Sequence, residues 1–291
     1  MPLCSVLLPS YNHEKYLEEA INSVINQTEE DWELIIIDDA SQDNSPLILD
    51  KFQKDDRIHI KRHDKNRGIA STLNQALKCS KGDFVAFIAS DDVWHPRKLE
   101  EQLEILKKND EQIVWSEGLI LNDKSVAAGE KFTHIYKSPQ KSGYIFQELI
   151  QGNFIFGSSI MLKKSFLDDV EFDTQLRFLN DHKLYLDLAF KYKFYFIPEA
   201  LAAYRIHGDN TTFNDLSAWY QDSVKLSSYI FREYLPQRPS ISKKCLFDLC
   251  CVNPLYHGLR VNPWNKFNLY YLIVLPLWYI YMVISGRRLN P

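Results

Sequence analysis

Two apolar runs, each followed by a pair of aspartates, constrain the fold of this chain most. Residues 34–37 (LIII) lead into the pair at 38–39, and residues 84–88 (FVAFI) lead, through two further residues, into the pair at 91–92. Continuous β-branched and aromatic runs of this length are typical of parallel strands buried on both faces. Ligands of open α/β sheets bind outside the carboxyl ends of such strands, so we expect all four carboxylates at one binding edge.

Carboxylates gathered at one edge repel one another unless a cation or hydrogen-bond donors compensate. Aspartate is also common in turns, and turn chemistry would explain a single pair. Two pairs at equivalent strand ends favour binding instead. We therefore expect this edge to hold a divalent metal and a nucleotide sugar.

The first part of the chain alternates strand and helix patterns, which is typical of βαβ units and a parallel sheet. We expect strands at 5–8, 34–37, 57–61 and 84–88, and helices at 14–25, 43–52, 69–77 and 96–108. Later strands are predicted at 113–115, 119–121, 156–162, 194–197 and 201–204. We expect a turn-rich loop at 123–142, and helices at 181–190, 216–234 and 243–255.

The length of 291 residues allows one large core and a substantial extension. We expect an α/β domain with a mainly parallel sheet at 1–212, a helical extension at 213–262 and an apolar segment at 263–291. The charged fraction of 25% and the net charge of −4 are those of a globular protein, and no long basic run suggests a nucleic-acid partner.

The cysteines and the N-terminus both indicate the cytoplasm. Five scattered cysteines show neither a metal-ligand spacing nor a disulfide pattern, which is typical of a reducing compartment. The N-terminus has no basic region of the kind that begins a signal peptide. We therefore expect a cytoplasmic catalytic part.

The C-terminal segment predicts contact with a membrane. Residues 267–285 carry no formal charge over nineteen residues, close to the roughly 20 that span a bilayer. Asn268, Pro276 and four tyrosines suit an interface better than a spanning helix. A helix packed on the protein core is the alternative.

Several short motifs follow one another along the chain: 5–12 (SVLLPSYN), 37–43 (IDDASQD), 66–68 (NRG), 81–83 (KGD), 89–92 (ASDD), 180–181 (ND) and 204–207 (YRIH). Together they resemble the inverting glycosyltransferases of family 2, which have a Rossmann-like GT-A fold. The resemblance covers residues 3–210. Three positions depart from the family pattern: Ala40 replaces a glycine, while Ala89 and Asn180 each replace an acid.

The resemblance implies donor contacts from Pro9, Tyr11, Asp39, Arg67 and Asp91. The Tyr11 ring could stack on a pyrimidine, and Asp39 could accept the base N3–H. Arg67 could reach a base carbonyl or a phosphate, and Asp91 could bind ribose hydroxyls. Tyr11, Asp39 and Arg67 each have a structural alternative: a packed loop aromatic, a turn cap and a solvated arginine.

The resemblance also implies a metal site and a base. We assign Mg²⁺ or Mn²⁺ to Asp92, whose position after a strand predicts a side chain that reaches solvent and ligand, with His207 as a further ligand. A structural role for His207 is equally common. Asp181 is the expected general base, ionised by the dipole of the helix that it begins, although a carboxylate there can also be an N-cap.

The expected reaction is inverting transfer of a hexose or deoxyhexose from a UDP- or dTDP-sugar to a hydroxyl of a glycan or lipid-linked glycan. The expected setting is bacterial surface-polysaccharide synthesis at the inner face of the cell membrane. One alternative is a nucleotidyltransferase, although residues 9–13 (PSYNH) lack the glycines of its usual phosphate loop. Another is a non-catalytic nucleotide-sugar or membrane-binding module, which Ala89 and Asn180 keep open.

Overall fold

The computed structural model describes residues 2–109, 112–208, 210, 216–234 and 236–237. The chain forms two compact units, and each is described by itself. Unit 1 comprises Met1–Ile145, Phe154–Thr174 and Asp187–Gly208, and unit 2 comprises Phe146–Asn153, Gln175–Leu186 and Asp209–Pro291. The predicted helix at 243–255 and the apolar segment at 263–291 lie outside the described residues.

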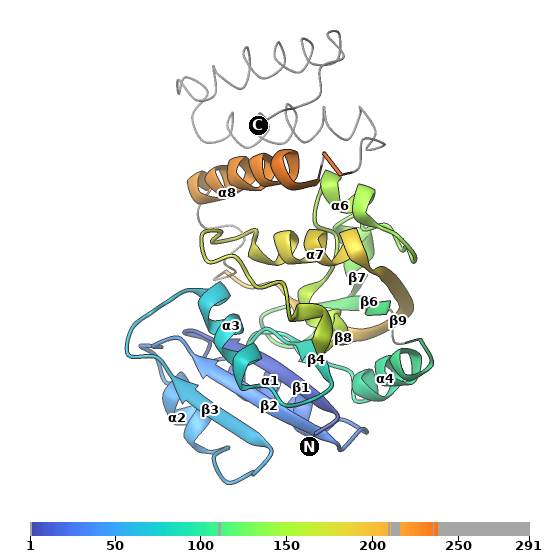
Figure 1. Ribbon diagram of the computed structural model, residues 1–291. Coiled ribbons are helices and arrows are strands. Elements are labelled where there is room, and N and C mark those ends of the chain that lie inside the picture. The colour runs from blue at the N-terminus through green and yellow to red at the C-terminus, as the bar shows by residue number, and fades with distance from the viewer. Residues whose placement is uncertain (1, 110–111, 209, 211–215, 235, 238–291) are drawn as a thin grey trace, which may run out of the picture. The chain divides into compact units, whose positions relative to one another are not determined.

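Unit 1 is built on a mixed sheet whose first half is parallel (Figure 1). Strand β1 (Cys4–Ser10) lies between β2 (Trp32–Asp38) and β4 (Phe84–Phe87), and β3 (Ile58–Arg62) pairs with the far side of β2. Every residue of β2 is buried, as its apolar run predicts. Because β1, β2 and β4 run parallel, their carboxyl ends meet at one edge.

The second half of the sheet contains antiparallel neighbours. Strand β8 (Met161–Lys163) is antiparallel to β4 and to β6 (Gln112–Leu121), and β6 is parallel to β9 (Lys193–Arg205). Strand β5 (Val93–Trp94) is antiparallel to β9. This pairing brings the end of β9 beside the turn that follows β4.

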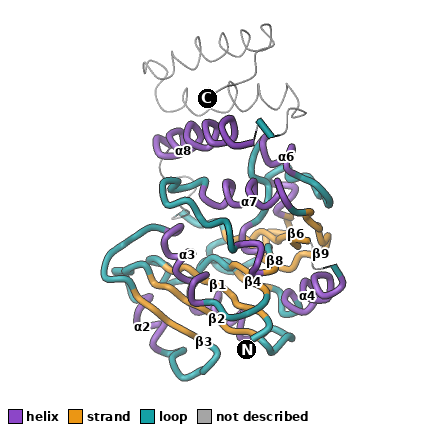
Figure 2. The backbone as a smooth tube through the Cα atoms, in the orientation of Figure 1, coloured by secondary structure: helices purple, strands orange, loops and turns teal. Residues whose placement is uncertain are grey.

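Helices cover both faces of the parallel half, and Figure 2 shows their alternation with the strands. Val6 and Leu8 pack in one core with α1 (Leu17–Ile25), α2 (Ser45–Asp50) and α4 (Lys98–Lys108). Leu7 points to the opposite face, because side chains alternate along a strand. Helix α3 (Ile69–Cys79) lies against β1 and β2.

The second half of unit 1 differs from three sequence predictions. The predicted loop at 123–142 contains β7 (Ala127–Lys131) and α5 (Phe132–Ile135), and β7 is exposed throughout, so no apolar periodicity reveals it. The predicted strand at 156–162 is instead a 3-10 helix, Gly157–Ser159, followed by β8. Four short predicted strands are parts of only two, β6 and β9, which pair over ten residues with register shifts near Glu117.

Unit 2 contains α6 (Phe146–Gln151), the start of α7 (Asn180–Lys191), α8 (Leu216–Tyr229) and a π-helix, Ile230–Tyr234. The last two confirm the helix predicted at 216–234. Asp222 Oδ2 accepts the backbone N–H of Phe178 at 2.7 Å, which ties α8 to the segment before α7. Within the described ranges, no helix is long and apolar enough to cross a bilayer.

Candidate active site

Three potential ligand side chains converge at the carboxyl edge of the sheet in unit 1. His13 follows β1, Asp91 follows β4 and His207 follows β9, and one ligand atom from each lies within 4.8 Å of the others. His207 Nε2 is 3.0 Å from Asp91 Oδ2, and His13 Nδ1 is 2.7 Å from Ser90 Oγ. One carboxylate and two imidazoles are a donor set that suits a divalent transition ion such as Mn²⁺.

Asp92 does not face this cluster. Its carboxylate accepts hydrogen bonds from Ser158 Oγ and from the backbone N–H of Arg205, and only 2% of the residue is exposed. The expectation that its side chain reaches solvent is therefore wrong. We predicted the metal role for Asp92 and the ribose role for Asp91, but the carboxylate that lies with His207 is that of Asp91.

The two neighbouring aspartates also differ in proton affinity. Burial acts to raise the pKa of Asp91, but the hydrogen bond with His207 and the positive potential of the His13 and His207 imidazoles outweigh it, so its pKa is lowered. Burial and the adjacent Asp91 charge raise the pKa of Asp92 well above its ordinary value. The pair therefore concentrates its negative charge on Asp91, the member that faces the imidazoles.

Asp39 organises the loop that follows β3. Its Oδ1 accepts the backbone N–H of Arg67 at 2.8 Å and lies 2.6 Å from His63 Nδ1, and its Oδ2 accepts the N–H of Gly68 at 2.8 Å. A carboxylate offers about four acceptor positions, so these three contacts leave Asp39 one, in a residue of which only 3% is exposed. Gly68 has a φ of 84°, which explains the glycine of the NRG motif.

The other predicted donor contacts lie on β1, in the loop after β1 and in the loop after β3. Pro9 is half-buried in β1, opposite Ile37 of β2. Tyr11 follows β1 and is 43% exposed, so its ring is accessible for stacking. The side chain of Arg67 forms an exposed ion pair with Asp64 at 2.8 Å, a contact of small energetic value that does not fix it.

The loops after β1 and β2 contain two strained residues. Asn12 has a φ of 53° and Ala40 a φ of 63°, both in the left-handed region. Asn12 Oδ1 accepts the N–H of Gln42 at 2.7 Å, which links the two loops. Ala40 stands where the family pattern has glycine, and its conformation gives the physical reason for that preference.

Asp181 is the second residue of α7 and belongs to unit 2. Its Oδ1 accepts a hydrogen bond of 2.6 Å from the backbone N–H of His182, and its Oδ2 accepts one of 3.0 Å from Asn153 Nδ2. Burial outweighs these hydrogen bonds and raises the pKa of Asp181 to about 6. The helix dipole therefore does not control this carboxylate, contrary to our expectation. A group with a pKa of about 6 is still mostly ionised at pH 7, as a general base must be.

Sequence reasoning missed three residues of the site. His13 carried a usable signal, because it lies in the loop that follows a predicted parallel strand, as the aspartates do. Arg205 lies inside the YRIH motif, but nothing in the sequence assigned it a role. Ser158, which accepts the N–H of Ala89 and donates to Asp92, has no sequence signal, because the pairing of distant segments places it there.

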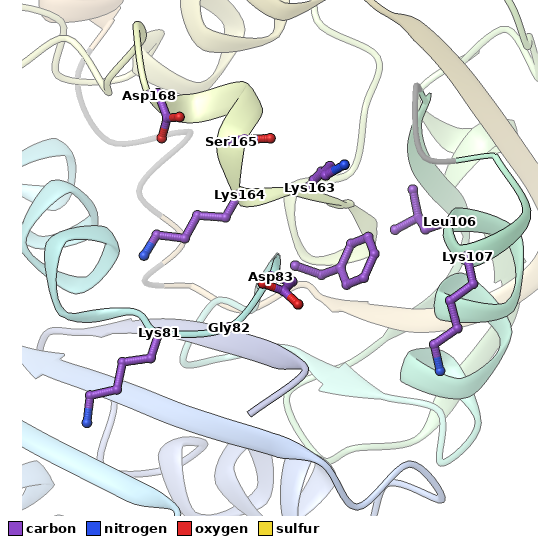
Figure 3. A pocket seen from close by; sticks show the side chains of 10 residues that line it. Lys81, Gly82, Asp83, Leu106, Lys107, Lys163, Lys164, Ser165 and Asp168 are labelled. Carbon is purple, nitrogen blue, oxygen red and sulfur yellow. The ribbon is translucent and has the colours of Figure 1, made fainter. Parts of the chain in front are cut away.

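A separate hollow of about 670 Å³ lies at the amino end of β4 (Figure 3). The hollow is lined by four lysines and two aspartates: Lys81, Lys107, Lys163, Lys164, Asp83 and Asp168. The predicted site residues are not among those that line it, and the Asp91 turn follows the other end of the strand. The hollow is therefore distinct from the candidate active site.

Comparison with known proteins identifies glycosyltransferases among the relatives of this chain. The sequence model of glycosyl transferase family 2 matches residues 5–170. A Bacillus subtilis (strain 168) protein named "Putative teichuronic acid biosynthesis glycosyltransferase TuaG" is 31% identical over 234 residues, which are 80% of this chain and 88% of TuaG. The Escherichia coli UDP-Glc:alpha-D-GlcNAc-diphosphoundecaprenol beta-1,3-glucosyltransferase WfgD is 34% identical over 58% of this chain and 64% of its own length.

Solved structures share the fold. The crystal structure of S. aureus TarS residues 1–349 in complex with UDP-GlcNAc matches with a TM-score of 0.71 at 17% identity, over 96% of this chain and 81% of the TarS 1–349 chain. The chain spans only 32% and 39% of two longer relatives, both uncharacterized glycosyltransferases of Rickettsia.

Proposed function

This chain belongs to glycosyl transferase family 2, and from that membership we propose that it transfers a hexose or deoxyhexose from a UDP- or dTDP-sugar to an acceptor hydroxyl with inversion. The observation that carries the proposal is the convergence of His13, Asp91 and His207 at the carboxyl edge of a parallel sheet. Tyr11, whose ring is exposed, is proposed to stack on a nucleotide base, and Asp39, a buried residue with 3% exposure, is proposed to accept a hydrogen bond from that base through its remaining acceptor position.

The donor base is proposed to be a pyrimidine. Tyr11 offers one stacking face, and Asp39 offers an acceptor for the N3–H of uracil or thymine. The backbone N–H groups of Arg67 and Gly68 hold the Asp39 carboxylate in place, so the acceptor is preorganised. The UDP-GlcNAc complex of TarS and the UDP-Glc in the name of WfgD support a uridine donor.

Of the two expected ions, Mg²⁺ and Mn²⁺, Mn²⁺ is the proposed cofactor, because two imidazoles suit a transition ion better than Mg²⁺. Asp91, His207 and His13 would hold it, rather than Asp92, because their ligand atoms already lie together. When bound, the cation supplies positive charge that stabilises the leaving nucleoside diphosphate. Asp92 is then proposed to orient the turn that carries Asp91, through its hydrogen bonds with Ser158 and with the backbone of Arg205.

Asp181 is the proposed general base, which takes the proton of the acceptor hydroxyl as its oxygen attacks the anomeric carbon. Two observations support this role. Its carboxylate receives two hydrogen bonds that orient it, and its pKa of about 6 is close to the value that suits a base at neutral pH.

The proposed acceptor is a glycan or a lipid-linked glycan in surface-polysaccharide synthesis, at the cytoplasmic face of the membrane. The names of TuaG and WfgD support it, the latter through its diphosphoundecaprenol acceptor. The uncharged run at 267–285 is proposed to contact the membrane. Deleting 264–291 should weaken pelleting with anionic vesicles more than UDP binding, and unchanged pelleting would contradict the membrane role.

A nucleotide panel tests the donor proposal. Thermal unfolding of the full chain is followed with UDP, dTDP, GDP or ADP, each with and without Mn²⁺. A ligand at 100 times its Kd stabilises the folded state by about 2.7 kcal/mol, so UDP or dTDP should raise Tm by several degrees. A larger rise with GDP would overturn the pyrimidine assignment.

Turnover separates the proposed reaction from its alternatives. Mn²⁺-dependent release of nucleoside diphosphate from the stabilising nucleotide sugar is expected, and it should be lost in Asp91→Asn. Asp83→Asn is the matched control, because Asp83 precedes the opposite end of β4 and lines the separate hollow. Release of pyrophosphate would indicate a nucleotidyltransferase, and binding without turnover would indicate a non-catalytic module.

A further inference from the structure

The guanidinium of Arg205 is fully buried and contacts three separate segments of unit 1. Its Nε donates to the carbonyl of Asp91 at 2.7 Å, its Nη2 to Glu19 Oε2 on α1 at 2.8 Å, and its Nη1 to Ser125 Oγ, after β6, at 2.8 Å. The backbone N–H of Arg205 donates to Asp92 Oδ1 at 3.1 Å. One residue therefore ties α1 and the turn after β6 to the aspartate turn.

The same guanidinium is also connected to His207 through an aromatic ring. Arg205 Cζ lies 4.9 Å from the ring centroid of Tyr16, which lies 4.6 Å from that of His207. His207 Nε2 in turn faces Asp91 Oδ2. Arg205 thus supports Asp91 through a hydrogen bond to the Asp91 backbone carbonyl, and supports His207 through the ring of Tyr16.

The orientation of Arg205 depends on Glu19 and Ser125. Glu19 Oε2 accepts from Arg205 and also from Ser125 Oγ, at 2.6 Å. A buried guanidinium charge requires such a partner, and Glu19 supplies it. Lysine would not reproduce this arrangement, because its single ammonium lacks the planar fork that reaches three acceptors at once.

We infer that Arg205 is a positioning residue that presets Asp91 and His207 for a divalent cation, an inference that rests on the proposed function. Loss of a residue that contacts and orients metal ligands without binding the metal itself typically lowers metal affinity by about 10–100-fold. A purely structural role predicts a different outcome: a lower Tm with an unchanged affinity for the cation.

The test measures binding of Mn²⁺ alone to the full-length protein, from the electron paramagnetic resonance signal of free Mn²⁺, together with Tm. The variants are Arg205→Lys and Glu19→Ala, and Glu18→Ala is the matched control. Glu18 lies beside Glu19 on α1 and forms an ion pair of the same length, 2.8 Å, with Lys51. The control therefore removes the same carboxylate charge from the same helix, together with an exposed ion pair, without touching Arg205.

The Kd for Mn²⁺ should rise about 10–100-fold in Arg205→Lys and in Glu19→Ala, and should be unchanged in Glu18→Ala. Glu19 has a 40% exposed side chain on a helix surface, so Glu19→Ala decides the question if Arg205→Lys fails to fold. A wild-type Kd in Glu19→Ala overturns the inference, whatever its Tm. A wild-type protein that does not bind Mn²⁺ overturns the cation assignment of the proposed function as well.

Discussion

Replacing Asp181 with asparagine should lower activity and raise stability together. Burial raises the pKa of Asp181 from 3.8 to about 6. Between these two values the folded protein binds more protons than the unfolded chain, so stability falls as pH rises through this window. A difference of this size corresponds to about 3 kcal/mol at most, and the partial exposure of Asp181 reduces it to about 1–2 kcal/mol. An asparagine side chain cannot ionise, so the Asp181→Asn variant should be more stable by that amount at pH 7.

The same substitution should reduce the transfer rate by roughly 10²–10⁴-fold, as expected for loss of a positioned base. In the wild type, kcat should fall about tenfold per pH unit below pH 6, because only the ionised carboxylate of Asp181 accepts a proton. Asn153→Ala removes a hydrogen bond to that carboxylate and should move this acidic limb to higher pH. Donor affinity should not change in either variant.

The assays are kcat between pH 5 and 8 with the nucleotide sugar selected by the panel, and urea unfolding of both proteins at pH 4 and pH 7. If Asp181 were only a helix cap, Asp181→Asn would retain near-normal turnover, since asparagine caps about as well as aspartate. Near-normal turnover, or an acidic limb that persists in Asp181→Asn, would refute the base assignment. Equal stability of the two proteins at pH 7 would refute the argument from burial.

Three further predictions concern the framework of unit 1. Lys98 is fully buried, donates to Gln102 Oε1 at 2.6 Å, and has its pKa lowered by burial from 10.5 to about 7. Between about pH 7 and 10.5 the unfolded chain binds this proton and the folded protein does not, so the free energy of unfolding should rise by about 3 kcal/mol between pH 6.5 and 9.5. Urea unfolding should show that most of this rise is lost in Lys98→Met. An equal pH dependence of the free energy of unfolding in the wild type and in Lys98→Met would contradict the assignment of this rise to Lys98. Ala40→Gly should stabilise the fold by about 1 kcal/mol, because glycine adopts a positive φ without the Cβ penalty, and an unchanged Tm would argue against strain at this turn. Gly82→Ala should lower the free energy of unfolding by about 3 kcal/mol in urea unfolding, because the added Cβ would lie 2.6 Å from the backbone nitrogen of Ser5. An unchanged free energy of unfolding would mean that β1 can move away.

Local patterns were sufficient for the parallel half of the fold and for much of the site. The apolar run at 34–37 is a strand buried at every residue, because strands covered on both faces must be apolar throughout. The carboxyl ends of such strands necessarily share an edge, so the positions of Asp39 and Asp91 at one edge followed from the sequence. Family membership also followed, because the motifs keep their order along the chain.

Tertiary structure alone decided which side chains face one another. Asp91 and Asp92 are neighbours in sequence, yet the turn directs Asp91 toward His207 and Asp92 toward Ser158. Arg205 reaches Glu19 across 186 residues. These contacts depend on the pairing of β9 with β6 and β5, and such pairing is set by the packing of whole strands. No local pattern encodes it, which is why the sequence located the edge of the sheet while the fold selected the residues that meet there.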